Sequence, residues 1–230
     1  GQAIAIALAA AGADITCVGR SAADETTEQV KALGRRAQQV KADLSTIAPV
    51  QTVVDETLAR MGRLDILVNN AGIIRRNDAI NFTEEDWDAV LDTNLKSVFF
   101  LSQATAKHMI AAGGGKIINI ASMLTFQGGV RVPSYTAAKS AIGGLTKALA
   151  NEWSGKGINV NAIAPGYIET NNTAALRADE NRNRQIMERI PAGRWGRPGD
   201  LGGAAVFLAS SAADYVHGHV LAVDGGWLAR

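Results

Sequence analysis

The stretch KIINIASMLTFQGGVRVPSYTAAKSAIGGLTKALANEWSGKGINVNAIAPG, residues 116–166, contains the pattern that decides the fold. It opens with the apolar run KIINIAS (116–122) and closes with INVNAIAPG (158–166), and both runs have the length and composition of buried strands. Between them, apolar residues recur at helical spacing over 134–153, and we expect Ser134 to be the N-cap of this helix. This order predicts two parallel strands joined by a right-handed crossover.

The rest of the chain repeats the alternation of short apolar runs with helical segments. Strands are predicted at 14–19, 37–43, 64–72 with its turn, 116–122, 158–166 and 218–226, and helices at 1–12, 23–36, 46–62, 83–113, 134–153 and 198–210. Near-continuous apolar strands, each followed by a helix, are typical of a parallel sheet that is covered on both faces. We therefore predict an α/β fold with a doubly wound, Rossmann-like parallel sheet, formed by residues 1–230 as a single domain.

Two segments depart from this alternation. Residues 167–197, between the last two predicted strands, are polar and rich in Asn and Arg, and an excursion of this length predicts a lid over a binding site. At the other end, Gly1 stands directly before the first predicted helix, where a dinucleotide-binding fold has the last glycine of its Gly-rich turn. We expect the strand and the earlier glycines of that turn to be missing from the interior of the sheet.

Composition and charge argue against several classes of protein. The net charge of +1 argues against electrostatic binding to nucleic acid or to a membrane surface, and no apolar run is long enough to span a membrane. Cys17 is the only cysteine, which excludes an intrachain disulfide, and with three scattered histidines it leaves no cluster of metal ligands. We expect a soluble protein of the cytoplasm that binds neither metal, nucleic acid nor membrane.

Tyr135 and Lys139 suggest acid–base chemistry. They are four residues apart on the predicted helix and therefore lie on the same helix face. An ammonium beside a phenol favours the phenolate and lowers its pKa from about 10, which would make Tyr135 a proton carrier near neutral pH. Taken alone, however, the pair is more often a surface feature, because both residue types are common.

Other polar groups follow predicted strands, at the edge of the sheet where ligands bind in doubly wound folds. The turn NNAG begins at Asn69, Ser122 ends the strand KIINIAS, and Pro165 and Gly166 end the next strand. Asn94 lies inside a predicted helix, where Asn competes for backbone hydrogen bonds; it is either an exposed helical Asn or a group that organises a water next to Lys139.

In this order and spacing, the NNAG turn, Asn94, Ser122, Tyr135-x-x-x-Lys139 and the Pro-Gly turn resemble the short-chain dehydrogenase/reductase family. The resemblance covers the whole chain except its start. It implies that Tyr135 exchanges a proton with the substrate oxygen while Ser122 hydrogen-bonds that oxygen. It also implies that Lys139 lowers the pKa of Tyr135 and holds the nicotinamide ribose, and that Asn94 anchors a water linked to Lys139.

The same resemblance implies a nicotinamide dinucleotide as cofactor. Its expected contacts are Gly1, Arg20, Ser21, Asp43, Leu44, Asn69, Ala71, Gly72, Tyr135, Lys139, Pro165, Gly166, Ile168 and Thr170. Gly19 holds the position where an acid would bind the ribose of NAD, and Arg20 follows it, so the local charge favours NADP. Arg20 alone could equally be a solvated arginine. The chain also resembles a narrower group within the family, described next, whose members are expected to favour NAD. Both NAD and NADP therefore remain candidates for the cofactor.

Several stretches are similar to members of the family that interconvert a keto-sugar acid and its diketo form, among them NNAGIIRR, VRVPSY and the ending VDGGWLAR. A carboxylate substrate needs an arginine fork, and Arg131 is the first candidate, with Arg76 and Arg194 weaker ones. Gln127 and Asn171, with Asn172, could bind substrate hydroxyls, and Trp195 and Trp227 could wall the pocket. Each of these arginines and tryptophans could instead serve packing, an ion pair or a subunit contact.

Two other functions remain alternatives: a reductase of another carbonyl, such as a 3-oxoacyl thioester, and a nucleotide-binding protein without catalysis. The polar 167–197 segment favours a small polar substrate over an acyl carrier, and a mere binding module would not need Tyr135. The family resemblance also implies a homotetramer.

Overall fold

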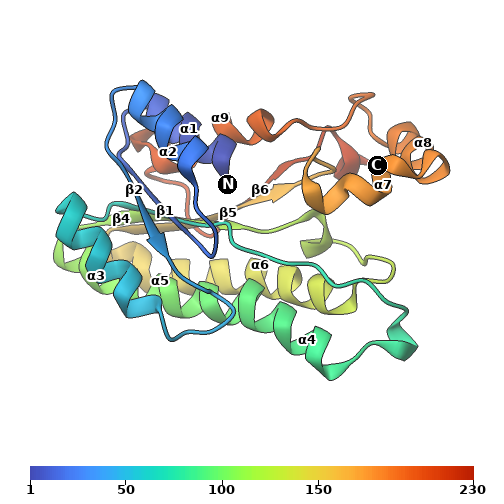
Figure 1. Ribbon diagram of the computed structural model, residues 1–230, viewed down its shortest axis with the longest axis horizontal. Helices are drawn as coiled ribbons and strands as arrows, with labels where there is room; N and C mark the ends of the chain where they lie inside the picture. The colour runs from blue at the N-terminus through green and yellow to red at the C-terminus, as the bar shows by residue number, and fades with distance from the viewer.

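The computed structural model describes residues 1–230 and contains alternating strands and helices (Figure 1). The strands are β1 (Ile15–Gly19), β2 (Ala37–Lys41), β3 (Ile66–Asn69), β4 (Gly115–Ile120), β5 (Ile158–Pro165) and β6 (Val220–Val223). The α-helices are α1 (Gln2–Ala10), α2 (Asp24–Ala32), α3 (Val50–Met61), α4 (Glu84–Leu91), α5 (Ser97–Ala111), α6 (Pro133–Trp153), α7 (Ala174–Ala178), α8 (Glu180–Arg189) and α9 (Gly202–Ala209). Every predicted strand is present, and no helix is long and apolar enough to cross a membrane.

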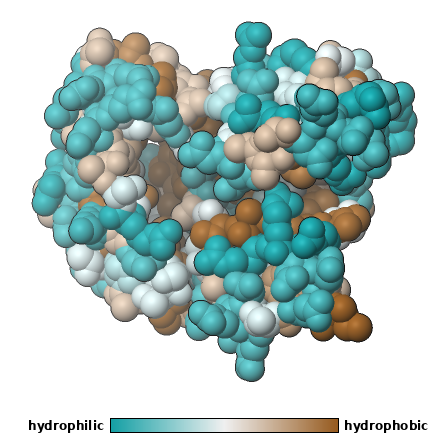
Figure 2. All heavy atoms as spheres, turned by 45° about the vertical axis from the view of Figure 1, so that its right-hand side comes forward, coloured by the Kyte–Doolittle hydropathy of each residue, from teal (hydrophilic) through white to brown (hydrophobic).

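All strand pairs are parallel, but the strands form two separate sets. β1 pairs with β2, and the other four strands follow the order β3-β4-β5-β6. Between β1 and β3 lies a cavity of about 600 Å³, lined by residues of both strands and of α1, α3 and α5. The cavity separates the two-stranded set from the four-stranded set. In Figure 2 most of the visible surface is hydrophilic, and a deep opening has hydrophobic atoms along its wall.

Helices cover both faces of the sheet, because neighbouring strand residues point to opposite sides. Ile117 on β4 packs against α5 and α6 in one buried cluster, whereas Ile118 packs against α1 and α9 in another. Figure 1 shows the same division, with α1, α2 and α9 above the strands and α3 to α6 below them. The predicted doubly wound arrangement is therefore confirmed.

One local prediction was wrong. Helix α6 begins at Pro133 after Val132, so Ser134 lies inside the helix, and its buried hydroxyl has no hydrogen-bond partner. Proline starts the helix instead because the first turn requires no N–H from it. The long helix predicted at 83–113 is confirmed: α4, a π-helical turn at Asp92–Lys96 and α5 follow one another without a break. The segment 167–197, predicted to be a lid, contains the two helices α7 and α8.

Candidate active site

Tyr135 and Lys139 lie on one face of α6, as their spacing predicted. The Lys139 Nζ atom is 5.6 Å from the centre of the Tyr135 ring. Lys139 is buried, with 4% of its surface exposed, and its ammonium donates a hydrogen bond to the carbonyl of Ile120 at the end of β4. The helix therefore brings a phenol and an ammonium to the carboxyl end of a central strand.

Ser122 follows the same strand, and hydrogen bonds hold the short segment that begins with it against α6. The backbone N–H of Leu124 donates to the Ser122 hydroxyl oxygen at 3.1 Å. The Thr125 hydroxyl donates to the Lys139 carbonyl at 2.7 Å, and the Ser140 hydroxyl donates to the Leu124 carbonyl at 3.0 Å. Because the Leu124 N–H uses only an acceptor site of Ser122, the serine O–H remains available to donate to the Tyr135 phenol or to a bound oxygen.

Burial controls the protonation of both groups on α6. It raises the pKa of the Tyr135 phenol, while the neighbouring Ser122 hydroxyl and the Arg76 guanidinium lower it. Burial also lowers the pKa of the Lys139 ammonium to about 8. The structure therefore does not show the expected depression of the phenol pKa by Lys139, because loss of hydration outweighs the neighbouring charges. The cations nevertheless lie where they would stabilise a phenolate.

The lowered pKa of Lys139 predicts a pH-dependent stability. The pKa of its ammonium is about 8 in the folded protein and 10.5 ordinarily. Between pH 8 and 10.5 the unfolded chain therefore binds more protons than the folded protein. The free energy of unfolding therefore rises with pH across this window, by roughly 3 kcal/mol at 1.36 kcal/mol per pKa unit. Urea titrations without dinucleotide should measure the free energy of unfolding of wild type and of Lys139→Met at several pH values. As the pH rises from about 8 to 10.5, wild type should gain this amount of stability relative to the variant. A difference that stays constant with pH would contradict the assignment.

Asn94 holds the loop that follows β3. It lies in the π-helical turn and is 1% exposed. Its side-chain oxygen accepts from the N–H of Ile73 and its amide donates to the Ile73 carbonyl, both at 2.8 Å. A Cβ added to Gly72 would lie 3.3 Å from the same oxygen, so the loop packs closely on Asn94. The side chain therefore holds this loop in place, and the water expected beside Asn94 stays a prediction.

Asn69 points away from the ligand edge and into the core. Its amide donates to the side-chain oxygen of Asn119 at 2.8 Å and to the hydroxyl of Ser102 at 3.0 Å. Asn119 in turn donates to the hydroxyl of Thr146 on α6 at 3.0 Å. This buried chain ties β3, β4, α5 and α6 together, which leaves the backbone of Asn69 to meet a ligand.

The remaining expected cofactor contacts lie along the carboxyl edge of the strands. Arg20 and Ser21 follow β1 and are exposed; Asp43 and Leu44 follow β2. Hydrogen bonds from Ser45 lower the pKa of the Asp43 carboxyl, and the charge of Arg20 lowers it further, so Arg20 lies near Asp43. Gly1 precedes α1, and a Cβ added there would lie 2.9 Å from the Asn70 amide nitrogen. An extended dinucleotide fits this edge, because one row of backbone and polar groups follows it from β1 to β5.

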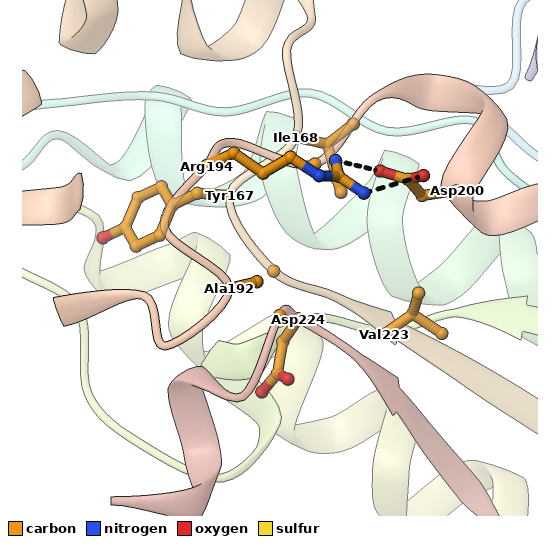
Figure 3. A pocket seen from close by; sticks show the side chains of 10 residues that line it. Tyr167, Ile168, Ala192, Arg194, Asp200, Val223 and Asp224 are labelled. Carbon is orange, nitrogen blue, oxygen red and sulfur yellow. Dashed lines mark hydrogen bonds and ion pairs between the residues drawn. The ribbon is translucent and has the colours of Figure 1, made fainter.

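The expected nicotinamide side is built at the end of β5. Pro165 is the last residue of that strand, and a Cβ added to Gly166 would lie 2.5 Å from the Cα atom of Asp224, so only glycine fits there. Ile168 is buried and bridges to Gly196, whereas Thr170 is exposed. Ala71 is partly exposed in the loop after β3. Figure 3 shows the neighbouring cavity of about 200 Å³, lined in part by Tyr167, Ile168 and Asp224.

The structure distinguishes the candidate arginines by their ion pairs. Arg131, the first candidate from sequence, pairs with Asp78 at 3.0 Å and has a backbone φ of 63°, in the left-handed region. Arg194 makes a two-pronged pair with Asp200, drawn with dashed lines in Figure 3. Arg76 contacts no carboxylate; it donates to the Asn172 carbonyl at 3.4 Å, and its charge acts on the Tyr135 phenol.

The other expected substrate contacts are less closely constrained. Asn171 is exposed in a short 3-10 helix of the 167–197 segment. Gln127 is partly buried and accepts a hydrogen bond from the indole of Trp227 at 3.2 Å. Trp195 and Trp227 are both buried, in one cluster with Met123, so they pack behind the site instead of facing solvent. Sequence reasoning missed the Trp227–Gln127 contact, since the two residues are 100 positions apart.

Comparison with known proteins agrees with this geometry. A short-chain dehydrogenase family model, described as "Enoyl-(Acyl carrier protein) reductase", matches residues 1–228. The chain belongs to the short-chain dehydrogenase/reductase family. Within the short-chain dehydrogenases, the chain is 62% identical to the 2-dehydro-3-deoxy-D-gluconate 5-dehydrogenase of Escherichia coli (strain K12), over 100% of this chain and 91% of the relative. It is 56% identical to the enzyme of the same name from Bacillus subtilis (strain 168), with the same coverage.

A solved short-chain dehydrogenase structure has the same fold. The gluconate 5-dehydrogenase from Burkholderia cenocepacia J2315, in complex with NADP and tartrate, superposes with a TM-score of 0.94 at 42% identity. The match covers 100% of this chain and 92% of that one. The family prediction made from the NNAG, Ser122 and Tyr135-x-x-x-Lys139 motifs is therefore confirmed.

Proposed function

We propose that this protein is an NAD(P)-dependent oxidoreductase that interconverts 2-dehydro-3-deoxy-D-gluconate and its 5-keto form. The observation that carries the proposal is the convergence of Ser122, Tyr135 and Lys139 at the carboxyl end of β4. The names of the relatives at 62% and 56% identity support the substrate.

In the proposed reaction the chain's own residues handle the proton. A bound nicotinamide supplies the site that accepts or donates the hydride. Ser122 donates its free O–H to the substrate oxygen and fixes its position. In the oxidation direction Tyr135 takes the hydroxyl proton from that oxygen, and in reduction it returns the proton. Lys139 and Arg76 stabilise the phenolate that the oxidation direction requires.

The cofactor would lie along the edge from β1 to β5. Arg20, exposed after β1, favours the 2′-phosphate of NADP, because a guanidinium pairs well with a phosphate. The NADP in the Burkholderia relative is consistent with this choice. NAD remains the alternative that the sugar-acid relatives suggested, and the two dinucleotides are compared directly in the test below.

For the substrate carboxylate, the geometry favours Arg76 over Arg131. Arg131 is neutralised by Asp78, whereas Arg76 contacts no carboxylate and acts electrostatically on Tyr135. Arg76 also contacts Asn172, so residues 167–197 would act as a lid that meets the same substrate. Gln127 and Asn171 are proposed contacts for the substrate's hydroxyl groups.

We further propose a cytoplasmic homotetramer, as the family resemblance implies. The partly exposed Trp87 on α4 and Ile110 on α5, at 40% and 38% exposure, are available for subunit contacts.

Kinetics with a panel of carbonyl compounds test the proposed function. The panel contains the 5-keto form of 2-dehydro-3-deoxy-D-gluconate, a neutral ketose and a 3-oxoacyl thioester, each with NADH and with NADPH. We expect kcat/KM for the keto-sugar acid to exceed that for the thioester at least about 100-fold, because a carboxylate held by a guanidinium contributes roughly 3 kcal/mol. Preference for the thioester would favour the acyl reductase, and no turnover of any compound would favour a binding protein.

A further inference from the structure

Trp227, near the end of the chain, contacts three separate parts of the structure. Its indole N–H donates to the side-chain oxygen of Gln127 at 3.2 Å. The Arg189 guanidinium, at the end of α8, lies 4.0 Å from the centre of the indole, and the Tyr167 ring meets it edge-on at 4.8 Å. With 5% of its surface exposed, the indole is fixed by these contacts.

The contact with Trp227 determines which end of the Gln127 amide faces the indole. An indole N–H can only donate, so the group that it meets must be the amide oxygen. The NH₂ group of Gln127 therefore points away from the indole, and it has no hydrogen-bond partner within the protein. The Gln127 amide could present either its oxygen or its NH₂ group to a ligand. The contact with Trp227 leaves it only the two N–H donors to present.

Gln127 is part of the loop that joins Ser122 to Tyr135. A Cβ added to Gly129 in this loop would lie 2.7 Å from Leu124 and from Val132 side-chain atoms, so the loop folds tightly onto itself. Met123, next to Ser122, packs in the same cluster as Trp227. A displacement of the indole would therefore disturb the loop between Ser122 and Tyr135.

The last residues of the chain connect this loop to α8. Arg230 donates to the carbonyls of Glu188 and Arg189 at 2.7 and 3.2 Å, at the end of α8 where carbonyls lack helical partners. Arg189 itself stacks on Trp227. The C-terminal segment, residues 227–230, is thus bound both to the loop before α6 and to the lid.

We infer that Trp227 is a positioning residue for substrate specificity. Its indole N–H donates to the amide oxygen of Gln127 and so turns the Gln127 NH₂ group toward the oxygens of an acidic or hydroxylated substrate. The inference deepens the proposed function and rests on it for the identity of the substrate. Trp227 touches no reacting atom in this scheme, and its effect passes through Gln127.

Three variants separate orientation from packing. Trp227→Phe keeps an aromatic ring in the cluster but removes the N–H. Gln127→Glu keeps an acceptor for the indole but removes both donors, and the double variant combines the changes. We expect Trp227→Phe to raise KM for the keto-sugar acid about tenfold with kcat within about threefold, since one hydrogen bond to a charged or polar oxygen is lost. Gln127→Glu should raise KM at least about tenfold, because it also adds a negative charge that repels an acidic substrate. The double variant should add little to Gln127→Glu, because both changes remove the same interaction.

Hydrogen exchange of the Trp227 indole in ¹⁵N-labelled protein provides a readout that needs no substrate. We expect exchange to accelerate in Gln127→Ala and to stay slow in Gln127→Glu. Unchanged exchange in Gln127→Ala would overturn the contact, whatever the substrate is. An unchanged KM in Trp227→Phe beside a raised KM in Gln127→Glu would overturn the positioning role. If the wild type did not turn over keto-sugar acids, the proposed function would be refuted. Only the orientation of the Gln127 amide by Trp227 would then remain of the inference.

Discussion

Tyr135→Phe is expected to lower kcat for the keto-sugar acid about 1000-fold. The substitution removes only the phenolic O–H that would exchange a proton with the substrate oxygen, and positioned acid–base groups contribute roughly 100- to 10,000-fold. The ring stays in place on α6 beside Lys139, so the packing of the helix changes little. Steady-state rates in both reaction directions, with saturating dinucleotide, measure the effect.

Dinucleotide affinity and a matched tyrosine variant provide the controls. Titration by cofactor fluorescence should give a Kd within about threefold of wild type for Tyr135→Phe, because a single lost hydroxyl contributes little to a large ligand. Tyr215 is 99% exposed, and Tyr215→Phe should leave kcat unchanged. If Tyr135→Phe retained wild-type kcat, another group would carry the proton and the acid–base scheme would be refuted.

The order of strands and helices could be predicted from sequence because it depends on local periodicity. The apolar runs before Ser122 and up to Gly166 become β4 and β5, and the four-residue spacing of Tyr135 and Lys139 places both on one face of α6. Backbone geometry alone determines these relationships. The motifs could likewise be assigned to a family, because their order and spacing resemble those of the short-chain dehydrogenases.

The protonation state of the site could not be predicted from spacing. A cation beside a phenol lowers its pKa, but burial in the fold raises the pKa of Tyr135 instead, and the same burial lowers the pKa of Lys139 to about 8. The competition between charge and lost hydration depends on how tightly the neighbouring loop closes over α6. That loop is held by Thr125 and Ser140, whose partners are known only from the tertiary structure.

Ion pairing between distant residues also escaped sequence reasoning. Arg131 is close to Tyr135 in sequence and was the first candidate for a substrate carboxylate, yet Asp78 binds it across more than 50 positions. The π-helical turn at Asn94 is similar, since the hydrogen bonds to Ile73 that accompany it join segments 21 residues apart. Neither partner could be inferred from local pattern.

Arg76→Met is expected to lower kcat/KM for the keto-sugar acid about 100-fold. Arg76 is the guanidinium whose charge acts on the Tyr135 phenol and that contacts no carboxylate of the protein, so an acidic substrate can supply its missing partner. Loss of a charge-assisted hydrogen bond costs about 1.5–3 kcal/mol, and loss of a two-pronged contact lies at the upper end of this range. The effect should appear mainly in KM, because the pair forms on binding.

Arg75→Met is the matched control, because it removes the same charge from the neighbouring residue, which is already paired with Asp86 at 3.0 Å. We expect it to change kcat/KM less than threefold, which would show that overall charge is not the cause. With Arg76→Met a neutral ketose should lose much less than the keto-sugar acid, because only the effect of Arg76 on the Tyr135 phenol remains. With Arg75→Met it should lose little. If Arg76→Met impaired the neutral and the acidic substrate equally, Arg76 would act on the Tyr135 phenol and not on the carboxylate. Arg131, released from Asp78, would then be the arginine to test.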